Sequence, residues 1–294
     1  MNRVRAQMRH GAQPPHEFLE LGHLLHELRL FKSPGELKLM RRAAAIAAEA
    51  QIAAMRATRA GGREYEVEAA LQYVYRRNDA VAAYEPIVGS GANACVLHYR
   101  ANNGPVADGD LLLCDAGAEY AGYASDITRT WPVSGRYSKE QRALYDVVLA
   151  AQAAALAQAR PGRPWIAGHE AAVETIADGL LSLGLLKGSL KSVIASGAYK
   201  KFYMHKTGHW LGLDVHDVGD YKVAGDFREL EPGMVFTIEP GLYIPPGTKG
   251  VAAKWQGIGI RIEDDVVITK TGHEVITEGA PRAVDAVESV LATR

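Results

Sequence analysis

The same order of elements occurs twice along this chain. One Ala-rich helix is predicted from Ser33 to about Thr58, and a second from about Lys139 to Ala159. Each ends at an Arg- and Gly-containing turn, residues 59–63 and 160–163, and is followed by another helix and then by strand-like sequence. Residue identity between the halves is weak, and helix-helix-strand orders also recur by chance. The repeated order suggests an internal duplication with a site between two halves.

The first of these helices has a clear start signal. Residues 33–36, Ser-Pro-Gly-Glu, form a capping-box pattern with proline at the first helical position. Residues 1–32 carry Pro14-Pro15 and scattered histidines without a sustained hydrophobic period. We therefore interpret residues 1–32 as a linker or the remnant of a preceding unit, and residues 33–294 as the main folded domain.

Composition narrows the class of protein. With 294 residues, of which 48% are hydrophobic and 23% charged, the chain can bury a large core. A net charge of −1 offers no basic surplus for nucleic acid, and no apolar run of about 18 residues predicts a membrane span. Two cysteines are too few for a disulfide framework, and the first residues lack the apolar segment of a secretory signal. We expect a cytoplasmic protein with no nucleic-acid or membrane partner.

Three histidines lie within twelve residues of the segment HKTGHWLGLDVH, residues 205–216. Histidine is the commonest metal ligand and titrates near neutrality, although a single histidine is more often a solvated or hydrogen-bonded residue. The apolar residues between His205, His209 and His216 predict burial, and buried imidazoles need polar partners. This segment is therefore a candidate site.

Two acids between the halves occupy more specific positions. The run DLLLCD, residues 110–115, predicts a buried strand that ends on Asp115, and YASDITRT, residues 123–130, places Asp126, Thr128 and Thr130 on one face. A hairpin turn centred on residues 120–121 sets Asp115 directly opposite Asp126, with Cβ atoms about 5 Å apart. Two ionised carboxylates at that separation need a shared proton or an intervening cation. For either acid alone, a turn residue that faces water is the alternative.

The last third of the chain supplies two more acids. MVFTIEPG, residues 234–241, predicts an apolar strand with Glu239 at its end. GIGIRIEDDVVI, residues 257–268, alternates so that its isoleucines share one face and Arg261 and Glu263 share the other. A salt-bridge pair on the solvated face of a sheet is the alternative for these two residues.

Together these segments resemble the aminopeptidase P and prolidase family of metallopeptidases, from about Leu30 onward. The motifs HWLGLDVHD and RIEDD are most similar to those of bacterial enzymes that remove an N-terminal residue preceding proline. The resemblance implies an α+β pita-bread fold, with two pseudo-symmetric halves around a curved antiparallel sheet. It also implies two divalent ions, most often Mn²⁺ with Co²⁺ or Zn²⁺ as alternatives. Five ligands are implied: Asp115, Asp126, His209, Glu239 and Glu263.

The resemblance also assigns roles. Asp126 and Glu263 bridge the two ions, Asp115 binds one, and His209 and Glu239 bind the other. A hydroxide between the ions attacks the peptide, and Glu239 passes its proton to the leaving proline nitrogen. His98, His205 and His216 act on the substrate, and Arg261 orients the bridging carboxylates. Four carboxylates and one imidazole make a hard donor set that suits manganese.

Two further histidines and two alternative functions complete the predictions from the sequence. His169 and His273 have no motif around them and are expected at the surface. Within enzymes, an Xaa-Pro dipeptidase is the alternative to an aminopeptidase acting on peptides with proline at the second position. A catalytically silent binding protein is a third reading, disfavoured by the intact ligand set.

This chain departs from the family at its N-terminus, where full-length members carry a substantial additional domain. Only about thirty residues precede the catalytic region here. We therefore expect a homo-oligomer, with a dimer as one option, that is smaller than the assembly of full-length members and has weak Xaa-Pro activity. We also expect Leu30 and its apolar neighbours to be partly exposed.

Overall fold

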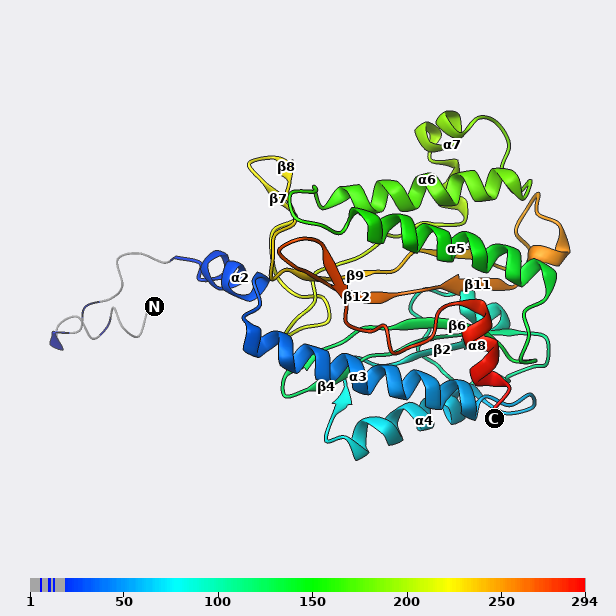
Figure 1. Ribbon diagram of the computed structural model, residues 1–294, viewed down its shortest axis with the longest axis horizontal. Helices are drawn as coiled ribbons and strands as arrows, with labels where there is room; N and C mark the ends of the chain where they lie inside the picture. Colours follow the sequence, from blue (N-terminus) through cyan, green and yellow to red (C-terminus); the bar gives the residue numbers. More distant parts are fainter. Residues whose placement is uncertain (1–5, 7–9, 12, 14–18, 294) are drawn as a thin grey trace.

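Both predicted helix pairs are present in the computed structural model, which describes residues 6, 10, 11, 13 and 19–293 (Figure 1). The first pair is α3 (Pro34–Ala57) and α4 (Glu64–Arg77). Ser33 begins α3 through the predicted capping box: its backbone N–H donates to Glu36 Oε2 at 2.7 Å, and its Oγ accepts from the Glu36 N–H at 3.4 Å. Gly61 lies in the turn between α3 and α4 and has a left-handed backbone conformation, with φ of 85°.

The second pair repeats this arrangement. A capping box of Ser138 and Gln141 begins α5 (Lys139–Gln158), and Gly162, with φ of 77°, lies in the turn before α6 (Ile166–Ser182). The short helices α7 (Leu190–Ser196) and η3 (Ala198–Lys201) follow. In Figure 1 the two pairs lie on opposite sides of the strands. The predicted α+β fold with two similar halves is confirmed.

The strands between the helix pairs are short, and each pairing is antiparallel. The first half contributes β1 (Val81–Ala82), β2 (Ile87–Ser90), η2 (Gly91–Cys95), β3 (Leu111–Asp115), β4 (Ala118–Tyr120), β5 (Tyr123–Ala124) and β6 (Thr128–Pro132). The second half contributes β7 (Lys222–Val223), β8 (Asp226–Phe227), β9 (Val235–Ile238), β10 (Gly241–Ile244), η4 (Ala253–Trp255), β11 (Ile258–Arg261), β12 (Asp264–Ile268) and β13 (His273–Val275). The helix α8 (Val284–Leu291) ends the chain's regular structure.

The register of the β3–β6 hairpin differs from the prediction. Asp115 pairs with Thr128, not with Asp126. The cause is the turn, which is centred on Ala121 and Gly122, both with positive φ (51° and 83°), one position later than expected. Positive φ at both central residues is typical of the tight two-residue hairpin turn. Moving the centre by one residue shifts the pairing by two, so Asp126 keeps the predicted face.

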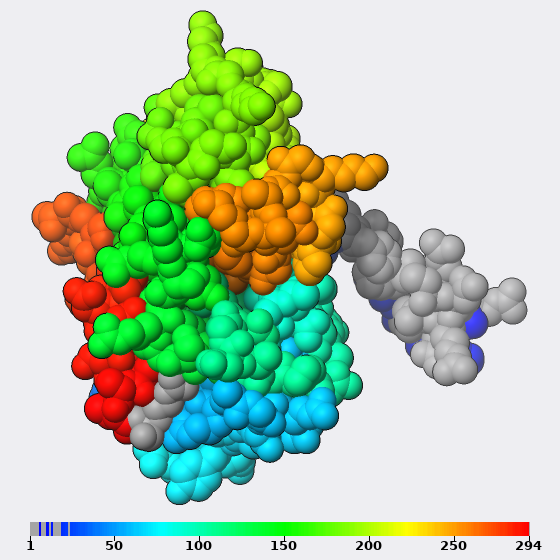
Figure 2. Space-filling view, turned by 90° about the vertical axis from the view of Figure 1, so that its right-hand side faces the viewer, coloured from blue at the N-terminus to red at the C-terminus, as the bar shows by residue number. Residues whose placement is uncertain are grey.

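Buried polar contacts join the two halves along β6 and the β11–β12 region. Arg129 and Asp264, whose side chains are both fully buried, form an ion pair at 2.7 Å. The Glu263 N–H donates to the Thr128 carbonyl at 3.0 Å, and the Thr130 hydroxyl donates to the Arg261 carbonyl at 3.0 Å. In Figure 2 the orange segment around η4 likewise lies between the green α5–α7 region and the first half. The strands that carry the candidate residues therefore meet at this seam.

Residues before Ser33 contribute more structure than predicted. They form the helix α2 (Gly22–Leu30), and Phe31 then makes an isolated antiparallel bridge to Met234. Leu30 is fully buried in the core around Trp210, so its predicted exposure was wrong, because the bridge draws the end of α2 inward. Leu24 and Leu28 are 56% and 72% exposed, as expected for this segment. The rest of the predicted linker, residues 1–5, 7–9, 12 and 14–18, lies outside the described residues.

Across residues 19–293, no helix has both the length and the apolar composition that crossing a membrane requires.

Candidate metal centre

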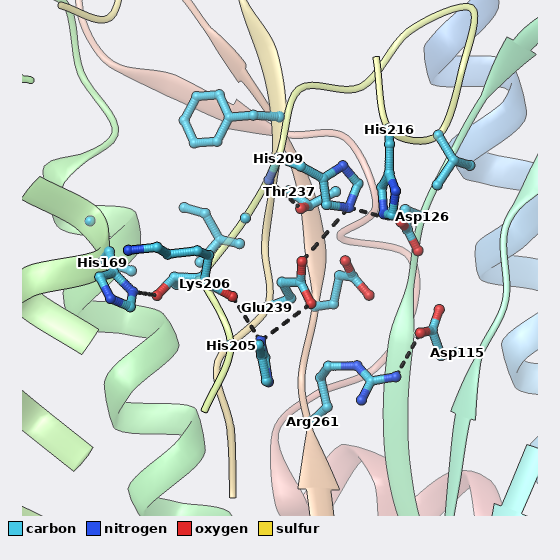
Figure 3. A pocket seen from close by; sticks show the side chains of 18 of the residues that line it. Asp115, Asp126, His169, His205, Lys206, His209, His216, Thr237, Glu239 and Arg261 are labelled. Atoms are coloured by element: carbon cyan, nitrogen blue, oxygen red, sulfur yellow. Dashed lines mark hydrogen bonds and ion pairs between the residues drawn. The ribbon is translucent and has the colours of Figure 1, made fainter. Parts of the chain in front are cut away.

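The five predicted ligands all line one cavity of about 1020 Å³. Figure 3 shows four of them, Asp115, Asp126, His209 and Glu239. Asp115 ends β3, Asp126 precedes β6, Glu239 follows β9, and Glu263 links β11 to β12. Asp126, His209 and Glu263 each place one ligand atom within 4.8 Å of the others. The His209 Nε2 atom also lies 3.7 Å from Glu239 Oε1. Three segments of the second half and two of the first therefore build one cluster.

His209 is oriented for metal binding by its own backbone neighbourhood. Its Nδ1 atom lies 3.0 Å from the Trp210 carbonyl oxygen, which can only accept, so Nδ1 carries a proton. The Nε2 atom then faces Asp126 Oδ2 at 3.4 Å. Burial acts to lower the pKa of His209, but the hydrogen bond to Asp126 and the charge of Glu239 raise it to about 9. An environment that attracts a proton to Nε2 also attracts a metal cation.

The four carboxylates repel one another in this buried setting. Burial, together with the charges of Asp126 and Asp115, raises the pKa of Glu239 to about 7. Burial and the neighbouring acids also raise the pKa of Glu263 well above its usual value. Divalent ions fit this donor set, because oxygen ligands suit hard cations and the excess negative charge needs compensation.

Arg261 is the cation that the protein itself supplies. Its side chain is 4% exposed, so the alternative of a solvated surface pair is wrong. Its Nη2 donates to Asp115 Oδ2 at 2.6 Å, its Nε to Thr128 Oγ1 at 3.1 Å, and its Nη1 to the Tyr243 hydroxyl at 2.9 Å. Thr128 in turn donates to Glu263 Oε2 at 2.5 Å. Arg261 thus fixes two of the acids, one directly and one through Thr128.

Tyr84 is a site residue that the sequence interpretation missed. Its hydroxyl lies 2.5 Å from Oδ1 of both Asp115 and Asp126. A phenol has one proton to donate, so it can satisfy one carboxylate at a time. No spacing motif marks this tyrosine, which opens a segment that was read only as strands and turns.

The three predicted substrate histidines all line the cavity, but their environments differ. His98 is exposed, on the turn after η2, and the His216 ring packs edge-on against His209 with centroids 4.3 Å apart. His205 already has protein partners for both nitrogens, the Lys206 carbonyl at 2.7 Å and the Tyr243 hydroxyl at 2.9 Å. Its Nδ1 also lies 3.9 Å from Glu239 Oε2. Of these three histidines, His98 and His216 therefore make no ring hydrogen bond to any described residue, whereas both nitrogens of His205 are engaged.

The expectation for His169 was wrong, whereas His273 is exposed as predicted. His169 projects from α6, lines the cavity, and its Nδ1 lies 2.8 Å from Thr207 Oγ1 (Figure 3). Burial, with the charges of Lys206 and Lys200, lowers its pKa to about 4. The sequence offered no signal for this contact, since the two residues are far apart in the chain and α6 was assigned only as a helix.

A pita-bread fold with an oxygen-rich, His-containing cluster at the seam of its halves is the arrangement expected of the metallopeptidase class. Residues 38–270 match the profile of metallopeptidase family M24, and the chain belongs to that family.

Among its relatives, the Xaa-Pro aminopeptidase of Escherichia coli (strain K12) is 44% identical over 292 residues, which are 99% of this chain and 66% of the relative. The solved structure of Pseudomonas aeruginosa aminopeptidase PepP matches with a TM-score of 0.97 and 54% identity, over 99% of this chain and 66% of that one. Aminopeptidase P from E. coli with the inhibitor Pro-Leu matches with a TM-score of 0.96 and 44% identity, over the same shares. The chain thus spans just under two thirds of the length of these relatives.

Proposed function

We propose that this chain hydrolyses the bond between an N-terminal residue and a following proline. The observation that carries the proposal is the convergence of Asp115, Asp126, His209, Glu239 and Glu263 beside a cavity that His98 and His216 also line. Relatives named Xaa-Pro aminopeptidase, one of them solved with substrate, support the substrate class. Because the chain covers only part of those relatives, the activity itself needs measurement.

Two divalent ions, most readily Mn²⁺, fit the ligand cluster, with Co²⁺ and Zn²⁺ as alternatives. Asp126 and Glu263 would be shared between the ions, Asp115 would bind one, and His209 and Glu239 would bind the other. When bound, such a pair of ions acts as a Lewis acid toward a carbonyl oxygen and lowers the pKa of coordinated water. A single ion would leave several buried carboxylates uncompensated, which favours two.

The chain's own residues would position the substrate and move protons. The Glu239 carboxylate accepts no hydrogen bond from any described residue, and the His209 Nε2 atom lies 3.7 Å from it. The His205 ring, 3.9 Å away, is a neutral neighbour, because burial lowers the pKa of His205 to about 3. The Glu239 carboxylate is therefore free to carry a proton to the leaving proline nitrogen. His98 and His216 would donate hydrogen bonds to the scissile carbonyl as negative charge develops on its oxygen. His205, held by Tyr243 and the Lys206 carbonyl, would act with His98 and His216 on the substrate.

The test is a metal-reconstituted assay with a proline-containing tripeptide, an Xaa-Pro dipeptide and an Xaa-Ala control peptide. We expect cleavage of the Xaa-Pro tripeptide only after loading with about two ions per chain. His98→Ala and His216→Ala should each lower kcat about 100-fold without loss of metal. His209→Ala should lose metal, and His273→Ala, at an exposed position outside the cavity, should behave as the unchanged protein.

Other outcomes would identify the alternatives. Cleavage of the dipeptide alone would indicate an Xaa-Pro dipeptidase. Peptide binding without cleavage at full metal loading would indicate a silent binding protein. Saturation at one ion, with no change in Asp126→Ala or Glu263→Ala, would contradict the shared-ligand assignment.

A further inference from the structure

Helix α2 and the residues directly after it form ion pairs with the chain segment that contains His216. We call residues 211–218 the His216 segment. Arg29 Nη2 lies 2.7 Å from Asp214 Oδ2 and 2.5 Å from Asp217 Oδ1, and Lys32 Nζ lies 3.2 Å from Asp217 Oδ2. These cations precede residue 38, where the match to the family profile begins. An element outside the matched region therefore contacts a wall of the candidate site.

The contacts at Asp217 are buried, which makes them more consequential than surface ion pairs. The side chains of Asp217 and Lys32 are 0% and 1% exposed, whereas that of Asp214 is 65% exposed. A buried carboxylate strongly requires its cationic partners, while an exposed pair contributes little. Asp217 Oδ1 also accepts the Val218 N–H at 2.9 Å, and the Asp217 N–H donates to the Trp210 carbonyl at 2.9 Å. Asp217, the residue directly after His216, is therefore held in place by several buried contacts.

Apart from these ion pairs, the His216 segment is held by apolar packing, since Leu211 belongs to a buried core cluster and Val215 packs against it. The segment contains no helix or strand, and its N-terminal end is held by two hydrogen bonds, from the Leu211 N–H to the Val235 carbonyl and from the Ala124 N–H to the Gly212 carbonyl. Among residues 19–293, neither Val215 nor His216 has a hydrogen-bond partner. The position of the His216 ring against His209 therefore depends on the anchors at both ends of the segment, and one of these anchors is Asp217.

We infer that Arg29 and Lys32 are positioning residues that hold His216 in place for the substrate by fixing Asp217. This inference rests on the proposed function for its effect on turnover, but not for its effect on His216 itself. It assigns a role in the site to α2 and the residues directly after it, none of which is a proposed metal ligand or lines the cavity.

The test compares Arg29→Gln, Lys32→Met and the conservative Lys32→Arg with a matched control, Glu27→Gln. The control removes another ion pair of the same helix, Glu27 with Arg228 at 2.6 Å, which does not involve the His216 segment. Four quantities are measured: metal content, kcat and KM for the Xaa-Pro tripeptide, and the NMR signal of the His216 ring in the protein loaded with diamagnetic Zn²⁺, assigned by its loss in His216→Ala.

We expect Arg29→Gln and Lys32→Met to shift the His216 signal and to lower kcat about tenfold with metal content unchanged, because small misplacements of a reacting group are costly. Lys32→Arg should recover most of the activity, and Glu27→Gln should match the unchanged protein. When combined with His216→Ala, Arg29→Gln should cause no further loss, since its effect acts through that ring.

Several results would overturn the inference. These are an unmoved His216 signal in Arg29→Gln, an equal loss in Glu27→Gln, or a full additional loss in the His216→Ala background. If Lys32→Met does not fold, Arg29→Gln, at a residue whose side chain is 28% exposed, decides the question. If the unchanged protein cleaves no Xaa-Pro peptide, the proposed function fails, and the His216 signal still tests the role of Arg29 and Lys32.

Discussion

Tyr84 places a single hydroxyl between two carboxylates that are expected to bind metal. It contacts Oδ1 of Asp115 and of Asp126, while Arg261 holds the other oxygen of Asp115. Such contacts orient ligands and are worth about 10- to 100-fold in metal affinity in other sites.

Tyr84→Phe should therefore lower the affinity for Mn²⁺ about 10- to 100-fold while the protein folds normally. A metal titration followed by calorimetry measures this change. Tyr123→Phe is the matched control, because the Tyr123 hydroxyl donates to Glu36, away from the site. Equal affinities for Tyr84→Phe and the unchanged protein would show that the hydroxyl does not support the ligands.

The depressed pKa of His169 gives a pH dependence of known sign. Its pKa falls from 6.5 to about 4 on folding, so the unfolded chain binds a proton between these values and the folded chain does not. Stability from the neutral ring is complete above about pH 6.5 and is lost as the pH falls toward 4.

When the pH falls from 6.5 to 4, the free energy of unfolding of His169→Gln should decrease less than that of the unchanged protein. The expected difference is about 1–2 kcal/mol, which allows for solvent screening of the partly exposed ring. Urea unfolding at several pH values measures the difference. If the free energy of unfolding changed with pH in the same way in both proteins, the His169 ring would be protonated as readily in the folded state as in the unfolded state.

At the scale of single residues, the sequence predicted best those site residues that lie in recognisable local motifs. Asp115, Asp126, His209, Glu239 and Glu263 each lie beside apolar strand-like or Gly-rich sequence that marks them out. Tyr84 and His169 have no such context, and their contacts depend on pairings between distant segments. Tertiary contacts of this kind leave no local signal.

The elements followed the sequence apart from the unpredicted helix α2, the β3–β6 register, and two predicted strands that are each divided in the structure, residues 123–130 and 257–268. Residues 257–268 were predicted as one alternating strand, but the structure divides them into β11 and β12 around Ile262 and Glu263. Alternation persists through the break, so Ile258, Ile260 and Ile262 still pack into the core as predicted. The pattern of faces was predictable because it depends on hydrophobicity, whereas breaks and turn centres depend on backbone dihedral angles.

Gly208 shows how closely two elements must approach to build the site. A Cβ atom there would lie 1.9 Å from the Thr237 carbonyl oxygen of β9. The same approach allows the Thr237 N–H to bond the His209 carbonyl at 3.0 Å and the Glu239 N–H to bond the Thr207 carbonyl at 2.8 Å. Two metal ligands are thereby placed side by side.

Gly208→Ala should force these segments apart, lowering the unfolding free energy by about 2 kcal/mol or more and weakening metal binding as well. Thermal unfolding and a metal titration measure both effects. Gly272→Ala is the control, because a Cβ atom there meets nothing within 4 Å. Normal metal affinity in Gly208→Ala would indicate that the two ligands tolerate separation.

For the whole molecule, metal binding and folding should be coupled, because the ligands come from both halves and only the folded chain brings them together. Metal at about 100 times its dissociation constant should add about 2.7 kcal/mol of stability. For a chain of this size, that corresponds to a rise of about 4 °C in Tm.

We therefore expect a chelator to lower Tm by about 4 °C, reversibly on addition of Mn²⁺. Differential scanning calorimetry measures this. Glu263→Ala, which removes a proposed shared ligand, should show little or no dependence on metal. A Tm that ignores the chelator in the unchanged protein would contradict the coupling. The predicted oligomer and the weak activity expected from the short N-terminal region remain predictions.

The seam between the halves has a consequence for how the protein acquires its chemistry. Asp115 and Asp126 belong to the first half, and His209, Glu239 and Glu263 to the second, so neither half holds a complete ligand set. Thr128, Arg129 and Thr130 of β6 hold the β11–β12 region by buried contacts, so strand docking and ligand assembly are the same event. During synthesis the nascent chain would stay inert until its last strands emerge, which delays peptidase activity until the fold is complete.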